Sequence, residues 1–166
     1  MATDRDWIRA AAQRYERPLL AYVHRLLGDV ERSRDVVQDA FLQLCKQPRK
    51  DLEARVAPWL FAVCRRRAID ILRKEKRMIA THDDVAEPMA KGMEPSQTAE
   101  LHETTRLVLA HLADLPPNEN EAVRLRFHQQ FSYREIAEVM GLSESHVGVL
   151  LHTALKTLRK SLPQLA

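Results

Sequence analysis

Cysteine and long apolar runs are scarce in this sequence of 166 residues, and their scarcity excludes several classes of protein. The two cysteines, Cys45 and Cys64, stand 19 positions apart without a histidine cluster beside them, so neither a disulfide framework nor a zinc site is indicated. We expect no metal and no other cofactor.

Apolar runs stay well below the roughly 18 residues that a membrane span needs. The first segment, MATDRDWIRA, carries charges where a signal peptide has its apolar core. We therefore expect a cytoplasmic protein with no membrane insertion. The sequence also lacks a nucleophile set, a metal-ligand set and a phosphate-binding loop, which argues against an enzyme.

Glycine is also rare, with 4 residues, while Ala, Leu, Arg, Glu and Gln are abundant. These are strong helix formers, whereas runs of β-branched residues are few. The hydrophobic content of 45% is enough for compact helical cores. We therefore expect an all-α protein.

Charge is distributed unevenly along the chain. Residues 1–77 hold 18 Lys/Arg against 11 Asp/Glu, a net charge of +7, whereas residues 78–100 hold 1 against 5, and residues 101–166 hold 7 against 7. A basic first half suits nucleic acid, an acidic protein or a membrane surface, and on its own it is equally compatible with a solvated basic face.

Two amphipathic helices are predicted early in the chain, over residues 7–27 and 31–46, with Gly28 and Asp29 between them. The apolar side of the second helix consists of Val36, Val37, Ala40, Phe41 and Leu44. The opposite side carries Asp35, Gln38, Asp39 and Leu42. Because this opposite side combines charge with one apolar residue, it is a candidate interaction surface.

A third helix is predicted over residues 59–77, WLFAVCRRRAIDILRKEKR. Its apolar residues recur at helical spacing: Leu60, Cys64, Ala68, Ile71 and Leu72. The other side carries Trp59, Arg66, Asp70, Arg73 and Arg77. Asp70 can neutralise part of this charge, being four residues after Arg66 and three before Arg73, but an anionic partner is missing. Arg67 falls near the apolar stripe, and we expect it to lie along that stripe.

Two small helical domains are predicted, with a flexible linker between them. Residues 78–100 lose the helical periodicity, become acidic and contain Pro88, Gly92 and Pro95, which is typical of a linker. It is too short for a further packed domain.

The clearest local signal lies in SYREIAEVMGLSESHVGVLLHTALKTLRKSL. Ser132 and Glu135 have the spacing of a capping box, Gly141 is placed to end the helix that begins there, and Ser143 can cap the next helix. This pattern predicts a helix-turn-helix, whose second helix would present its first residues to the major groove of DNA. An αα-hairpin without a DNA role is the alternative.

These segments together resemble the sigma-70 family of bacterial RNA polymerase initiation factors, in its compact extracytoplasmic-function (ECF) class. DVVQDAF is similar to the core-binding motif, WLFAVCRRRAIDILRKEKR to the promoter-melting segment, and LPPNENEAVRLRFHQQFSYREIAEVMGLS to the C-terminal domain. The resemblance implies sigma region 2 over residues 1–77, a linker over 78–100 and sigma region 4, with the helix-turn-helix, over 101–166.

The resemblance implies a factor that binds core RNA polymerase and directs promoter recognition and strand opening. Its implied partners are the β′ clamp and β flap of the polymerase, promoter DNA and an inhibitory anti-sigma factor. Contact with the clamp would come from Asp35, Gln38, Asp39 and Leu42.

The minus-ten DNA would be held by cations of the third predicted helix, because strand phosphates need positive charge. These are Arg65, Arg66, Arg73, Lys74, Lys76 and Arg77. Trp59 offers a surface for an unstacked base, but next to Leu60 we expect it to be a core anchor instead.

The minus-thirty-five element would be read by Ser143, Ser145, His146, Val149 and Thr153. This segment departs from the family, whose members commonly have basic residues here. A second departure is Arg66, where many members have Asn.

The residues alone leave two other functions open. A helix-turn-helix regulator that binds duplex DNA as a dimer would need a dimer surface and a basic recognition helix, and the sequence shows neither clearly. A helical adaptor that binds only protein is the other possibility, favoured by the scarcity of cations at the start of the recognition helix.

Overall fold

The computed structural model describes residues 3–80 and 103–162, and all of its regular secondary structure in these ranges is helical. The chain divides into two compact units, residues 1–92 and 93–166. The predicted all-α class with two helical domains is confirmed. Most of the predicted linker, residues 81–100, lies outside the described residues.

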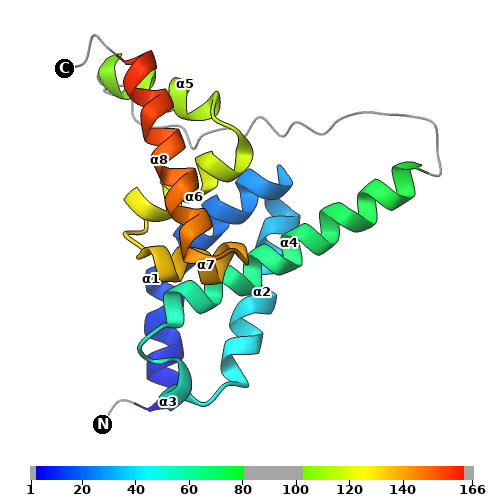
Figure 1. Cartoon of the computed structure of the whole chain (residues 1–166). Helices are drawn as coiled ribbons and strands as arrows, with labels where there is room; N and C mark the ends of the chain where they lie inside the picture. The colour runs from blue at the N-terminus through cyan, green and yellow to red at the C-terminus, as the bar shows by residue number, and fades with distance from the viewer. Residues whose placement is uncertain (1–2, 81–102, 163–166) are drawn as a thin grey trace. The chain divides into compact units, whose positions relative to one another are not determined.

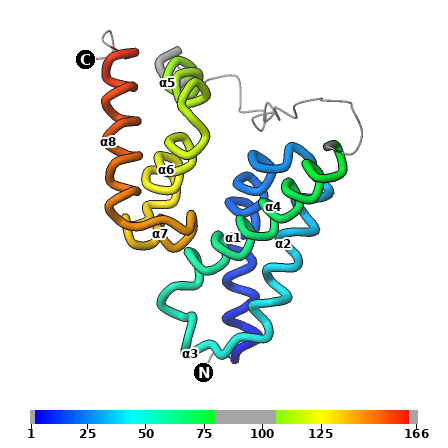
Figure 2. The backbone as a smooth tube through the Cα atoms, turned by 45° about the vertical axis from the view of Figure 1, so that its right-hand side comes forward, coloured from blue at the N-terminus to red at the C-terminus, as the bar shows by residue number. Residues whose placement is uncertain are grey.

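The first unit consists of α1 (Asp4–Leu27), α2 (Val30–Cys45), α3 (Arg49–Leu52) and α4 (Val56–Ala80) (Figure 1). The three long helices pack against one another in every pairing, and the short α3 connects α2 to α4. Figure 2 traces α4 as one uninterrupted helix of 25 residues.

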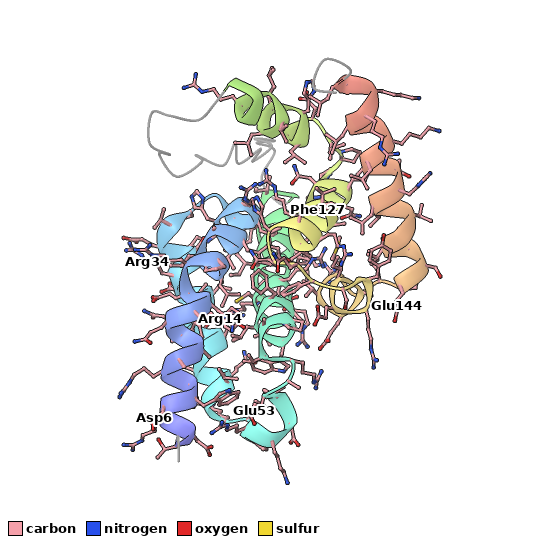
Figure 3. All side chains as sticks on the ribbon, turned by 90° about the vertical axis from the view of Figure 1, so that its left-hand side faces the viewer. Asp6, Arg14, Arg34, Glu53, Phe127 and Glu144 are labelled. Atoms are coloured by element: carbon pink, nitrogen blue, oxygen red, sulfur yellow. The ribbon has the colours of Figure 1, made fainter. Side chains whose placement is uncertain are left out.

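Local capping sets the ends of α1 and α2. Thr3 and Asp6 form a capping box, so α1 begins earlier than the apolar pattern predicts (Figure 3 labels Asp6). Gly28 ends the helix in the left-handed region, at φ 72°, and its N–H donates to the carbonyl of His24. Asp29 caps α2 by accepting from the Arg32 N–H at 3.0 Å.

The core of the first unit follows the predicted periodicity. Tyr22 and Phe61 bring α1 and α4 together, with ring centroids 5.1 Å apart. The buried side chains include Leu19 and Val23 of α1, Val36, Val37, Ala40 and Leu44 of α2, and Leu60, Cys64 and Ala68 of α4. Phe41, Ile71 and Leu72 are partly buried.

The second unit consists of α5 (Glu103–Ala113), α6 (Pro117–Phe127), α7 (Tyr133–Met140) and α8 (Glu144–Ser161). The long α8 packs on α5, α6 and α7. Asn120 joins α5 to α6, donating to the carbonyl of Leu112 and accepting from Nε of Arg124 at 2.6 Å. The core of this unit includes Ala122, Leu125, Ile136, Val147, Leu151 and Ala154.

The helix-turn-helix predicted from the sequence is confirmed in α7 and α8. The Ser132 hydroxyl accepts from the Glu135 N–H at 3.1 Å, and the Glu135 carboxylate accepts from the Ser132 N–H at 2.8 Å. Gly141 ends α7 at φ 67°, and Ser143 caps α8 by accepting from the His146 N–H. The capping box therefore fixes the start of α7, and the left-handed Gly141 with the Ser143 cap fixes the turn to α8.

Two glycines of this motif are expected to respond oppositely to alanine. At Gly148, inside α8, an added Cβ would meet the Tyr133 ring at 3.7 Å, an ordinary contact, so Gly148→Ala should stabilise the second unit by about 1 kcal/mol. At Gly141 the left-handed backbone strains any Cβ, so Gly141→Ala should destabilise it by about 1 kcal/mol. Hydrogen exchange of α7 and α8 amides measures both. Shifts of the same sign in the two variants would contradict this account.

Candidate functional site

The exposed side of α4, over residues 66–77, is mainly basic. Leu60, Cys64 and Ala68 face the core of the first unit and have no measurable exposure. The predicted cations on the other side are exposed, namely Arg66, Arg73, Lys74, Lys76 and Arg77. Arg65 is the exception, since it is partly buried and makes contacts of its own. We call the exposed residues Arg66, Asp70, Arg73 and Arg77, with the partly buried Trp59, the basic face of α4.

The two halves of α4 differ in how they are covered. Residues 60–64 are all buried, so this part of the first half belongs to the core. The second half is covered on one side, where Arg32 of α2 forms an ion pair with Glu75 at 2.5 Å. Both partners of this pair are about a third exposed, so it contributes little to stability, but it holds α4 against the start of α2.

Two residues of α4, Trp59 and Arg67, differ from expectation. Trp59 lies on the outward side and is partly buried, so it is neither a core side chain nor a fully exposed platform. Arg67 is exposed instead of lying along the apolar stripe. Among the described residues, no ion pair joins Asp70 to Arg66 or to Arg73.

Burial also controls the chemistry of Cys64. Loss of contact with water disfavours the thiolate and raises the pKa of this thiol to about 12. Cys64 is therefore a protonated core side chain at neutral pH, whereas Cys45 at the end of α2 is exposed. This agrees with the interpretation of Cys64 as part of the apolar stripe.

The polar side of α2 is exposed along its whole predicted length. Asp35, Gln38 and Asp39 are all exposed, and Leu42 has 62% of its surface accessible. The carboxylates and the leucine therefore share one surface, which can meet cationic and apolar groups of a partner at the same time. We call these four residues the α2 face.

The exposed side of α8 carries the residues predicted to read DNA. Ser143, Ser145, His146, Val149 and Thr153 are all exposed, and Val149 has 62% of its surface accessible. The first two turns carry one acidic residue, Glu144, whose position at the start of the helix appears in Figure 3.

Sequence reasoning missed a second, basic segment of α8. Its last turns line a shallow pocket whose residues recur at helical spacing: His152, Leu155, Lys156, Arg159 and Lys160. The spacing of Lys156, Arg159 and Lys160 in the sequence already indicates a basic side at this end of the helix. It was overlooked because the first residues of a recognition helix, and not its last turns, enter the major groove.

The described parts of the chain contain neither a membrane-spanning helix nor a metal-binding group of side chains. Across residues 3–80 and 103–162, none of the helices combines the length and the apolar character that a membrane crossing requires. In the same ranges, no group of three or more His, Cys, Asp or Glu side chains is placed to bind a metal ion.

Comparison with known families divides the chain as the structure does. Residues 11–78 match the family model "Sigma-70 region 2", and residues 111–160 match "Sigma-70, region 4". The chain belongs to the sigma-70 family. The first match covers α2 and all but the last two residues of α4, and the second covers the helix-turn-helix of α7 and α8.

Known relatives place this sigma factor in the extracytoplasmic-function class. It is 25% identical over 149 residues to the ECF RNA polymerase sigma factor SigM of Bacillus subtilis, covering 89% of this chain and 90% of that protein. It is 28% identical over 169 residues to SigL of Mycobacterium tuberculosis, covering 99% and 93%. These matches support a transcription initiation factor that directs promoter recognition.

A solved structure shares the fold of this sigma factor. The sigma factor RpoE of Bartonella quintana, crystallised with the anti-sigma factor NepR, superimposes with a TM-score of 0.68 at 21% identity. The match covers 94% of this chain and 96% of that chain.

Proposed function

We propose that this sigma factor docks on the β′ clamp of core RNA polymerase through the α2 face and holds the unpaired minus-ten strand on the basic face of α4. The exposed side of α8 reads the minus-thirty-five element, and the second unit also meets the β flap. The factor catalyses no reaction of its own and works with the polymerase in the cytoplasm. Region 2 then occupies residues 1–77, extended by the last turn of α4, and region 4 occupies residues 101–166.

The observation that carries this proposal is the division of α4 into a buried apolar side and an exposed cationic side. Arg66, Arg73 and Arg77 recur seven and four residues apart on the exposed side. Such a row can follow the phosphates of a single strand, while the ring of Trp59 is partly accessible to a base. Lys74 and Lys76 flank the row and widen the positive field.

The α2 face suits the β′ clamp because it offers groups that differ in kind. Asp35 and Asp39 can pair with cations of the clamp, and the Gln38 amide can fix the register by donating and accepting hydrogen bonds. Leu42 adds exposed apolar surface that gains free energy when it is covered.

The exposed side of α8 suits base edges better than phosphates. Ser145 and His146 can donate to or accept from base edges in the major groove, and Val149 can contact a thymine methyl group. Because cations are concentrated in the last turns, affinity for the minus-thirty-five element should be modest.

An anti-sigma partner also follows from the fold comparison. The Bartonella protein of the same fold was crystallised with an anti-sigma factor, and we infer that a comparable inhibitor binds this chain.

Run-off transcription from a promoter library tests the proposed function. Core RNA polymerase with this protein should give promoter-dependent transcripts that core polymerase alone does not give. The absence of such products on every promoter, despite binding of the protein to core, would favour an adaptor that binds only protein.

A further inference from the structure

The two acidic side chains of α4 have different surroundings. Glu75 is paired with Arg32 of α2, on the side of α4 that packs against α2. Asp70 is exposed on the basic face, and within the described residues neither a hydrogen bond nor an ion pair engages its carboxylate. Helix packing and charge pairing therefore account for Glu75 but leave Asp70 unexplained.

Asp70 lies in the middle of the surface proposed to hold the minus-ten strand. It is four residues after Arg66 and three before Arg73, which places all three on neighbouring turns of one helix side. Trp59 is eleven residues earlier and Arg77 seven later, so both lie on the same side. A strand that contacts these arginines therefore passes beside the Asp70 carboxylate.

A carboxylate at this position weakens general strand binding, because it repels the phosphates that the arginines attract. The repulsion is offset only where the carboxylate accepts hydrogen bonds from the nucleic acid. An ionised carboxylate accepts hydrogen bonds and donates none, so its partner has to be a base that offers hydrogen-bond donors. Asp70 is therefore suited to discriminate among bases and unsuited to add affinity for all of them.

The bases differ in the donors that their Watson–Crick edges expose when they are unstacked. Guanine offers two adjacent donors, at N1 and N2, which match the two oxygens of one carboxylate. Cytosine and adenine place an acceptor nitrogen beside their amino group, and thymine places its single donor between two carbonyls. Two parallel hydrogen bonds to one carboxylate are possible with guanine alone.

We propose that Asp70 selects guanine in the unpaired non-template strand of the minus-ten element, by accepting hydrogen bonds from its N1 and N2 atoms. This inference rests on the proposed function of the basic face of α4. A bidentate base contact of this kind should favour guanine about tenfold over a base that cannot make it.

The test uses holoenzyme assembled from core RNA polymerase and the full chain. Fork-junction DNA with randomised unpaired non-template positions is bound, and the retained strands are sequenced. Inosine is then placed at the strand position where guanine is enriched. This replacement removes the N2 amino group of the base and keeps the N1 donor. Asp70→Asn is the variant, since it retains the shape and loses the charge, and Glu16→Gln, at an exposed position of α1, is the matched control.

Wild-type holoenzyme and the Glu16→Gln control should enrich guanine at one position and lose about tenfold in affinity with inosine there. Asp70→Asn should lose the enrichment, tolerate inosine within about twofold, and bind strands without guanine more tightly because the repulsion of phosphates is gone. Unchanged base preferences in Asp70→Asn would overturn this inference alone. A wild-type holoenzyme that enriches no sequence would overturn the proposed function of α4 as well.

Discussion

Replacement of both Arg73 and Arg77 by alanine should abolish opening of the minus-ten region. The two side chains are exposed on the basic face of α4, four residues apart, so each can neutralise a phosphate of the captured strand. On a single strand each phosphate contact contributes about 0.7 to the slope of log affinity against log salt concentration. Loss of two such contacts should therefore reduce the magnitude of this slope by about 1.4. Permanganate footprinting of open complexes and binding titrations at several salt concentrations measure the two effects. Affinity for core polymerase should hardly change.

A paired substitution in the second unit serves as the control. Ser145→Ala with His146→Ala removes exposed polar groups of α8 and no Lys or Arg, so it should alter the preference among minus-thirty-five sequences with little change in the salt slope. If this pair removed strand opening on every promoter, and the arginine pair left it intact, α4 would not be the melting segment.

Charge reversal on the α2 face should separate this factor from its polymerase. Asp35→Arg replaces a carboxylate, which can pair with cations of the clamp, by a guanidinium group that repels them, and Gln38→Ala removes the amide. Association with core polymerase should therefore weaken more than about tenfold. Both residues are exposed and lie opposite Val36 and Ala40, so the helical circular dichroism should persist. Binding of labelled protein to core polymerase measures the change.

Glu16→Arg provides the matched comparison, because it reverses one exposed charge on a different helix, α1. It should leave core affinity near the wild-type value. Equal affinity of the wild type and the α2 variant would mean that another surface meets the clamp.

The elements that sequence patterns predict well are those in which local chemistry decides the structure. The ends of α7 and the start of α8 depend on Ser132, Glu135, Gly141 and Ser143, all within twelve residues, and each behaves as its local signal indicates. The buried side of α2 follows from periodicity for the same reason, since a helix that must cover a core repeats its apolar residues.

Features that depend on tertiary neighbours could not be predicted. All of residues 60–64 are buried, whereas helical periodicity predicts burial on only one side of this segment. The choice of Arg32 as the partner of Glu75 depends on how α2 packs against α4, and no spacing within α4 encodes it.

The site was predicted at the level of surfaces and less well at the level of single side chains. The expected residues of α2, α4 and α8 are exposed, apart from the partly buried Arg65, because exposure follows from helical phase. Arg67 and Trp59 differ because the outcome for a long or aromatic side chain at the edge of a stripe depends on its neighbours. The roles of these surfaces in binding polymerase and DNA stay predictions.

One uninterrupted α4 carries both the packing of Leu60 and Cys64 and the arginines of its outer half. At 1.5 Å per residue it is about 37 Å long, and no break separates its buried residues from its exposed arginines. The proposed basic face exists only when α4 is folded onto the core, so strand binding there would be thermodynamically linked to folding of the first unit. Under the proposed function, each bound strand stabilises the first unit, and a core substitution that unfolds part of the population lowers the apparent affinity for the strand.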